Sequence, residues 1–348
     1  MLNASVSEEY QYDLYRAKVI EMNEQVITNK DETRTVQEAK IKIMNRDKKG
    51  EEAIITNSLT GNELYDMNLK TGSIITVHFE NDNFYFIGYD NLRPMLFLGA
   101  LFLFFLILIG GIKGLKALFA LSITLSLILF LMVPMLLRGT SPILASILVC
   151  ALSTVITFYI ISGFNRKSIS ATVGTIGGLL IGGFVAYVFG VLTRLTGFSS
   201  NDATQLLYIP DAIKFDFRGL LFAGIIIGAL GACMDVSISI ASSLTELKKE
   251  NPNMDIKNLI KAGFNVGHDV MGTMINTLVL AYAGGTLTTL IVFAGFQTKL
   301  YHIVNLDFVA TEIVRAMAGS IGLLFAIPFT IFMFVLFPWK RVNLWRKF

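Results

Sequence analysis

Charged residues and cysteines are both scarce in this sequence, and each shortage narrows the class of protein. Asp, Glu, Lys and Arg make up 16% of the 348 residues, whereas a soluble domain carries about 25%. Apolar residues reach 53%, which excludes an ordinary soluble enzyme, a disordered chain and a disulfide scaffold. The formal net charge of +3 does not suggest the dense basic face of a nucleic-acid-binding protein, so no nucleic acid is expected as a partner. The composition indicates an integral membrane protein whose first partner is the lipid bilayer.

The two cysteines, Cys150 and Cys233, both fall inside long apolar segments. No pair is available outside the membrane to form a disulfide, so cysteine usage does not report the compartment. We expect both to be small buried apolar residues.

Charge is distributed unevenly along the chain. Residues 1–93 contain eleven Lys or Arg and sixteen Asp or Glu, whereas residues 94–348 contain eighteen and ten. The net charge is therefore −5 in the first part and +8 in the second. This contrast predicts a water-soluble acidic domain over 1–93 and a helical domain embedded in the bilayer over 94–348.

The apolar segments after Pro94 have the length of membrane-spanning helices. A hydrocarbon core of about 30 Å requires roughly 20 apolar residues in a helix. A lipid-facing β-barrel would alternate apolar and polar residues, and runs such as LFLGALFLFFLILIGG do not. The sequence predicts a polytopic α-helical membrane protein with about seven transmembrane helices, near residues 94–111, 115–137, 143–163, 169–192, 219–244, 270–293 and 314–337.

Basic residues in the connections predict the orientation. One set of alternate loops and its adjoining terminus hold twelve Lys or Arg, and the other set holds six. The richer set is expected in the cytoplasm, which places the C-terminus inside and residues 1–93 outside. Because Met1 to Gln11 has no apolar stretch that could export this domain, we expect a missing upstream transmembrane helix. An N-out insertion is the alternative.

The first 93 residues show the alternation of β-strands. Ile41 and Ile43 alternate with two lysines before the turn NRDKKG, and residues 74–79 alternate after the turn LKTG. Five or six strands in about 80 residues predict a small β-barrel of OB or lipoyl-like type. This outer domain is a candidate surface for a protein partner or a second protomer.

Two of the predicted spans carry polar residues at helical spacing. The fifth, GALGACMDVSISIASSLTEL, places four polar side chains within about 60° of arc on one side, namely Asp235, Ser239, Ser242 and Glu246. The sixth repeats the spacing with Asp269, Thr273 and Asn276. Residues 254–265, between the two, are predicted to form a separate interfacial helix on the inner leaflet. We expect Asp235 and Asn276 near mid-membrane, and Glu246 and Asp269 close to the cytoplasmic surface.

A carboxylate near the bilayer centre costs at least ~3 kcal/mol, so Asp235 is expected to face the bundle interior, a partner or a water-filled path. No Lys or Arg lies near it within its own span. One interpretation is a site for H⁺ or Na⁺, with the hydroxyl and amide groups completing the coordination. The alternative is a protonated Asp235 hydrogen-bonded to Asn276, which would only join two helices.

Glycines recur on the fourth and fifth spans. The fourth has six of them, and the fifth has Gly224, Gly228 and Gly231. Small residues at such spacing let helices approach closely, because lipid provides no hydrophobic drive for association. We expect close helix contacts at these positions, or a rocking contact in a transporter.

The segments GALGACMDVSISIASSLTEL and GFNVGHDVMGTMINTLVLAYAGG, with a β module ending in YDNLR, resemble the YibE/F-like family of bacterial membrane proteins. The resemblance implies a bacterial inner-membrane protein, and family members usually begin with a transmembrane helix before the β module. A fainter similarity is to the membrane core of SecD/SecF and RND transporters. It rests on three segments, namely residues 235–246, residues 254–265 and Met271-Gly272-Thr273. In that group such helices couple proton movement to conformational change.

These observations favour an ion-coupled secondary transporter or a translocation component. The second hypothesis is a non-transporting accessory or receptor protein whose outer β domain docks a partner. Enzymatic activity is not expected, because the chain has neither an H-E-x-x-H helix nor a Walker motif. No metal or cofactor is predicted, since a metal site at His268 and Asp269 would need ligands from elsewhere, such as Glu246.

Overall fold

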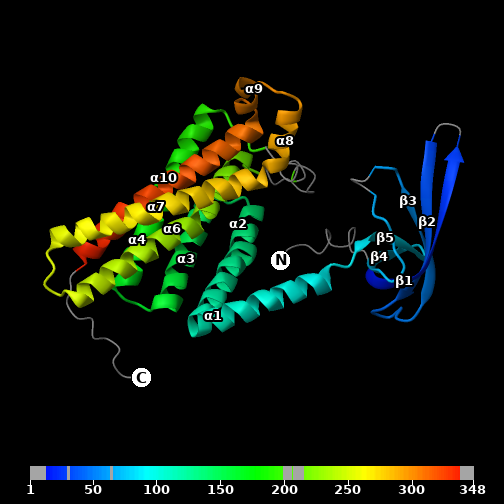
Figure 1. Ribbon diagram of the computed structural model, residues 1–348, viewed down its shortest axis with the longest axis horizontal. Coiled ribbons are helices and arrows are strands. Elements are labelled where there is room, and N and C mark those ends of the chain that lie inside the picture. The colour runs from blue at the N-terminus through cyan, green and yellow to red at the C-terminus, as the bar shows by residue number, and fades with distance from the viewer. Residues whose placement is uncertain (1–12, 30–31, 63–65, 199–205, 207–214, 338–348) are drawn as a thin grey trace. The chain divides into compact units, whose positions relative to one another are not determined.

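The computed structural model of the chain describes residues 13–29, 32–62, 66–198, 206 and 215–337 (Figure 1). The chain forms two compact units, Met1–Leu106 and Ile107–Phe348. The first holds a β module and the start of a long helix, and the second is helical.

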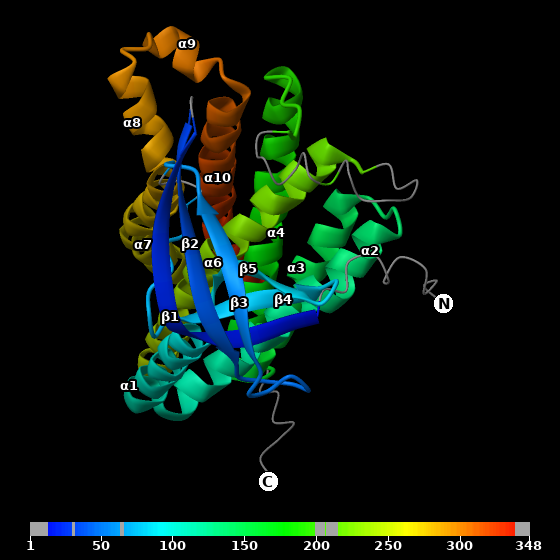
Figure 2. The same cartoon turned by 90° about the vertical axis from the view of Figure 1, so that its right-hand side faces the viewer.

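The β module is one antiparallel sheet with the strand order β3-β2-β1-β4-β5. Its strands are β1 (Asp13–Asn29), β2 (Glu32–Ile43), β3 (Glu52–Leu59), β4 (Ile74–Glu80) and β5 (Asn83–Tyr89). The sheet curls strongly (Figure 2), and its edge strands β3 and β5 come within 8 Å of each other between Cα atoms. The strands expected around Ile41, Ile43 and residues 74–79 are confirmed.

Alternation along the strands places one set of side chains in the core of the module. Ile41 and Ile43 are buried, whereas Lys40 and Lys42, which alternate with them, are exposed. Turns separate the strands where the sequence predicted them. Asn81 and Asp82 both have positive φ in the two-residue connection between β4 and β5, as tight hairpin turns require.

Hydrogen bonds from the segment before β4 join the two edges of the sheet. The buried Gln37 of β2 accepts from the backbone N–H of Leu69 at 2.9 Å, and from Asn57 of β3 at 3.1 Å. Asn57 also donates to the Met67 carbonyl at 2.8 Å, and Tyr89 of β5 donates to the Asn68 carbonyl. The segment 67–69 therefore lies between β3 and β5 and holds the curled sheet together.

Asp66 fixes the turn that leads into this segment. Its carboxylate accepts hydrogen bonds from the backbone N–H groups of Thr60 and Gly61, both at 2.7 Å. Hydrogen bonding to the Thr60 backbone is the main reason that the pKa of Asp66 lies below its usual value.

Helices dominate the described part of the chain after β5. Their bounds are α1 (Leu92–Leu127), a short π-helical turn η1 (Ile128–Met132), α2 (Val133–Leu137), α3 (Pro142–Ser162), α4 (Arg166–Leu192), α6 (Phe217–Glu250), α7 (Ile256–Gly285), α8 (Leu287–Gly295), α9 (Leu300–Val304) and α10 (Asp307–Leu336). Figure 1 shows α4, α6, α7 and α10 side by side.

Five helical stretches in the described part of the chain are long and apolar enough to cross a membrane. A sixth is added if α7 and α8, bent by 61° at their junction, form one broken span. The first stretch, Leu92–Leu137, is 46 residues long, but Gly111 interrupts its helical backbone with φ 53° and ψ −137°. These helices identify a membrane protein.

The segment between the fifth and sixth predicted spans differs from expectation. A separate interfacial helix over residues 254–265 was predicted, yet α7 runs without a break from Ile256 to Gly285. Gly263 and Gly267 explain the difference, because both are buried and lie against Ile331 and Ile327 of α10. This contact holds the first turns of α7 against the bundle, so the helix continues into the apolar stretch.

Glycines join α4 and α10 in the most extensive helix contact of the bundle. A Cβ atom built on Gly178 would lie 2.6 Å from the carbonyl oxygen of Gly322, and one built on Gly322 would lie 2.8 Å from the carbonyl oxygen of Gly178. Gly182 also lies against Gly322. The close contacts predicted for the glycines of the fourth span are therefore confirmed.

Replacing Gly322 tests this contact. Gly322→Ala should lower the free energy of unfolding by about 1–3 kcal/mol, because its methyl group would overlap backbone that cannot move independently. The measurement is the thermal midpoint of the purified protein in a mild detergent. Gly231→Ala on α6 is the matched control, since a Cβ atom there meets nothing within 4 Å. Equal midpoints for the two variants would contradict the close contact.

Candidate functional site

The polar residues of α6 lie on the side that faces away from the bundle core. Asp235 and Glu246 are exposed, and Ser239 and Ser242 are half-buried. The residues that flank Asp235 on the other side of the helix, among them Cys233 and Val236, are completely buried. The spacing of 4, 3 and 4 residues thus corresponds to one stripe along the outer side of α6.

The glycines of α6 extend the same stripe towards the start of the helix. Gly224, Gly228 and Gly231 precede Asp235 by eleven, seven and four residues. A Cβ atom at Gly224 or Gly231 would meet nothing within 4 Å, so the close contact expected at these two glycines is absent from the described structure. Only Gly228 has a neighbour, the hydroxyl of Tyr282, which lies 2.6 Å from the position of such a Cβ.

The polar residues of α7 are exposed as well. Asp269, Thr273 and Asn276 all lie on the outer side of the helix, opposite the buried Gly263 and Gly267. The Thr273 hydroxyl donates to the Val270 carbonyl at 2.9 Å, one turn earlier in the same helix. The Thr273 hydroxyl oxygen can still accept a hydrogen bond from another group.

α6 and α7 pack against each other, but their polar stripes are not joined by hydrogen bonds within the described residues. The Ser242 hydroxyl donates to the Ile238 carbonyl of its own helix at 2.6 Å. Glu246 forms an ion pair with Lys249 at 2.8 Å, one turn further along α6. Asp235 and Asn276 do not form the hydrogen bond that would join α6 to α7.

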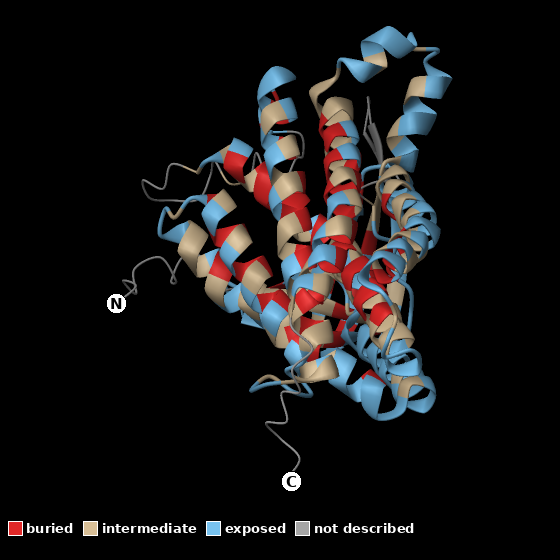
Figure 3. Ribbon diagram, turned by 90° about the vertical axis from the view of Figure 1, so that its left-hand side faces the viewer, coloured by how far each residue is buried: buried red, intermediate tan, exposed pale blue. Residues whose placement is uncertain are grey.

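We call the exposed stripes of α6 and α7 the polar face. On α6 it comprises the glycines at 224, 228 and 231 with Asp235, Ser239, Ser242 and Glu246, and on α7 it comprises Asp269, Thr273 and Asn276. In Figure 3 the buried positions run along the inner sides of α4, α6 and α10, whereas α7 is largely exposed on its outer side. No described side chain forms a hydrogen bond or an ion pair with the Asp235 carboxylate.

A charged pair that the sequence did not reveal lies beside this face. The sequence predicted the seventh span from residue 314, which puts Arg315 at its very end, next to the connection whose basic residues were counted for orientation. The structure begins α10 at Asp307, which places Arg315 two turns inside the helix. Its guanidinium pairs with Glu312 at 2.9 Å, and the two side chains are 28% and 19% exposed. The i, i+3 spacing of Glu312 and Arg315 was the available signal.

Tyr282 connects this pair to the polar face. The Arg315 guanidinium lies 5.8 Å from the centre of the Tyr282 ring on α7, within the range of a cation–π contact. The Tyr282 hydroxyl in turn lies against Gly228 on α6. The three helices α6, α7 and α10 therefore meet at one cluster, two helical turns from Asp235.

A metal centre needs several His, Cys, Asp or Glu side chains in one place. Within the part of the chain that the structure describes, no three such residues are gathered closely enough to hold a metal ion. His268 and Asp269 are adjacent and both exposed on α7, and Glu246 on α6 is engaged with Lys249.

Neutralising the charged pair one partner at a time tests its role. Arg315→Gln and Glu312→Gln should each destabilise the protein, because each leaves a partly buried charge without its partner. The double variant should recover part of the loss, with a coupling of about 1 kcal/mol in a double-mutant cycle of detergent-solubilised protein. Strictly additive losses would contradict a coupled pair.

Comparison with protein families accounts for both parts of the chain. Residues 98–340 match the YibE/F-like protein family, and residues 11–88 match the YibE/F family N-terminal domain. No curated protein and no solved structure matches the chain. The first match covers most of the helical bundle, including the whole polar face, and the second covers the β module. The chain therefore belongs to the YibE/F-like family.

Proposed function

We propose that this protein is an ion-coupled membrane transporter or translocation component in which Asp235 binds H⁺ or Na⁺. The observation that carries the proposal is the place of Asp235. It lies near the middle of the 34-residue helix α6, on the exposed side of that helix, and no described Lys or Arg forms an ion pair with it.

The free-energy cost of placing an ionised carboxylate in lipid supports this assignment. An ionised carboxylate that faced lipid at this depth would be unfavourable by ~3 kcal/mol or more. Asp235 must therefore border water, carry a bound proton or cation, or be covered by another protein. The stripe around it contains only small and polar residues, which suits a hydrated path better than a contact with acyl chains.

The other members of the polar face have supporting roles in this proposal. Ser239 and Ser242 on α6 and Thr273 and Asn276 on α7 supply hydroxyl and amide oxygens, which are suitable ligands for a hard cation. Asp269 and Glu246 lie nearer the predicted cytoplasmic end and would attract cations towards the path. The cluster of Tyr282, Glu312 and Arg315 would close the path on the opposite side.

A membrane accessory or receptor protein is the second candidate. The same open side of Asp235 favours it, because a second protomer or a partner helix could cover the polar face. In that case the outer β domain docks a protein partner, and the polar stripes only pack helices.

We infer a topology that completes this proposal. If Gly111 divides the first helical stretch and α7 with α8 forms one broken span, the chain crosses the membrane seven times. The curled five-stranded sheet is consistent with an OB-like barrel, which is a partly open five-stranded fold. The loop charges support an outer β domain and a cytoplasmic C-terminus, in the inner membrane of a bacterium.

Neutralising Asp235 tests the proposal. Protein that binds a cation at this site gains stability by mass action, about 2.7 kcal/mol at a hundredfold excess over the dissociation constant. The wild-type thermal midpoint in nanodiscs should therefore depend on Na⁺ at constant ionic strength, or on pH between about 5 and 8. Asp235→Asn should abolish that dependence.

Glu250→Gln is the matched control, because it removes one negative charge from the same helix at its exposed end. It should keep the wild-type dependence on Na⁺ or pH. A wild-type midpoint insensitive to both, or a dependence that survives in Asp235→Asn, would exclude cation binding at this site and leave the receptor hypothesis.

A further inference from the structure

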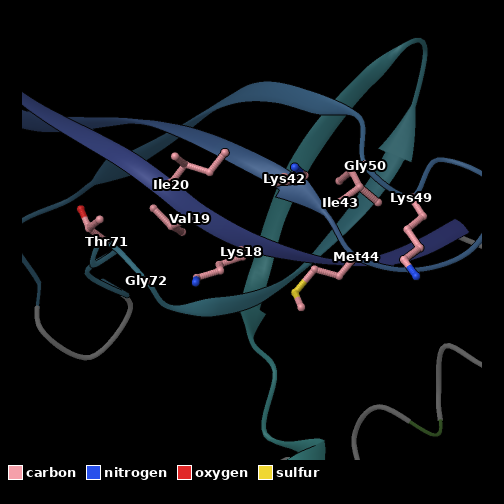
Figure 4. A pocket seen from close by; sticks show the side chains of 10 residues that line it. All are labelled: Lys18, Val19, Ile20, Lys42, Ile43, Met44, Lys49, Gly50, Thr71 and Gly72. Carbon is pink, nitrogen blue, oxygen red and sulfur yellow. The ribbon is translucent and has the colours of Figure 1, made fainter.

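A pocket on the β module has a lining that differs from the rest of this acidic domain. Its volume is about 530 Å³, within the usual range of small-molecule sites. Figure 4 shows the ten residues around it, which include Lys18, Lys42 and Lys49 but neither Asp nor Glu. Three positive charges are thus gathered in a domain whose net charge is −5.

Two of these lysines are held in an unfavourable arrangement. Lys18 of β1 and Lys42 of β2 are register partners, directly opposite each other on adjacent antiparallel strands. Like charges in this position destabilise a sheet. On its other side Lys42 has Glu52 of β3 as register partner, but the Glu52 carboxylate pairs with Lys40. An anion bound between Lys18 and Lys42 would relieve their repulsion.

The two acidic side chains that follow Gly50 are already engaged with other lysines. Glu52 pairs with Lys40 at 2.9 Å, and Glu51 pairs with Lys48 at 3.6 Å. The hydrogen bond from Lys40 is the main reason that the pKa of Glu52 lies below its usual value. Lys18, Lys42 and Lys49 form no ion pair among the described residues.

Apolar groups form the remainder of the lining. A β-bulge between Val19 and Glu21 leaves Ile20 without a register partner in β2. Bulges bend a strand and redirect its side chains. Ile20 and the half-buried Met44 both line the pocket, so a ligand there would contact hydrocarbon as well as lysine ammonium groups.

Backbone hydrogen bonds hold the two rims of the pocket in place. The N–H of Gly50 donates to the Ile43 carbonyl at 2.8 Å, and the N–H of Gly72 donates to the Val19 carbonyl at 2.9 Å. Both glycines have positive φ, which other residues adopt with strain. The site is therefore formed before any ligand arrives.

We propose that this pocket binds a small amphiphilic anion, a carboxylate or phosphate monoester attached to a short alkyl or aryl group. The lysines would hold the charged group, and Ile20 and Met44 would contact the apolar part. This proposal is independent of cation binding at Asp235.

The Met44 methyl group provides a local readout. Full-length protein with ¹³C-labelled methionine methyl groups would be placed in phosphatidylcholine nanodiscs, and the Met44 resonance assigned with Met44→Leu. Hexyl phosphate should shift this resonance saturably, inorganic phosphate should bind at least tenfold more weakly, and hexanol should leave it unchanged. A saturable shift from phosphatidylglycerol nanodiscs alone would identify a lipid as the source of the anion and equally support the site.

Charge variants separate the pocket from general attraction. Lys18→Gln with Lys42→Gln should weaken hexyl phosphate binding at least tenfold while the thermal midpoint stays equal or rises, because their repulsion is removed. Arg46→Gln, which removes a positive charge from the same domain but outside the lining of the pocket, should bind as the wild type does. Absence of a Met44 shift, an equal response to hexanol, or unchanged binding by the double variant would overturn the proposal.

Discussion

The contact between α4 and α10 is the constraint on which the rest of the helical bundle depends. Lipid provides no hydrophobic drive for helices to associate, so they are held by close packing of small residues. Gly178 and Gly182 of α4 meet Gly322 of α10 backbone to backbone. α6 packs on both of these helices, and α7 packs on α10 and α6. One side of α6 and one side of α7 therefore pack against the bundle, and their other sides face away from it.

The polar face follows from this arrangement. The buried sides of α6 and α7 satisfy the packing, and the acidic residues Asp235, Glu246 and Asp269 of the two helices are exposed on the outer sides. Asp235 thus lies at the surface of the protein rather than within its core, and its stability in a membrane requires water, a bound cation or a protein cover. The proposed function requires water or a bound cation at Asp235. The lysine pocket of the β module is a separate site with the opposite charge preference.

Periodic patterns in the sequence predicted part of this structure well. The strand alternation at Ile41 and Ile43 and the packing glycines of α4 were both apparent, because each depends on residues close together in the chain. The sequence did not show that Gly224 and Gly231 lie in open space, because a glycine in a helix contact and a glycine without one look the same in sequence. The continuity of α7 depended on Ile327 and Ile331 of α10, far away in the chain. The pair of Arg315 and Glu312 is local, but it became visible only once α10 was seen to begin at Asp307. The lysine pocket required the register of β1 against β2, which the sequence does not specify.

Hydration of the polar face is the central claim, and thiol accessibility measures it directly. Single cysteines would be introduced in place of Ser239 on the polar face and Leu152 on α3, in a protein whose Cys150 and Cys233 are replaced by alanine. Leu152 is exposed at the middle of α3, where lipid should surround it. A charged, water-soluble maleimide needs thiolate and therefore water at the site. The account predicts rapid labelling of Ser239→Cys and little labelling of Leu152→Cys in nanodiscs, and equally slow labelling of both would contradict it.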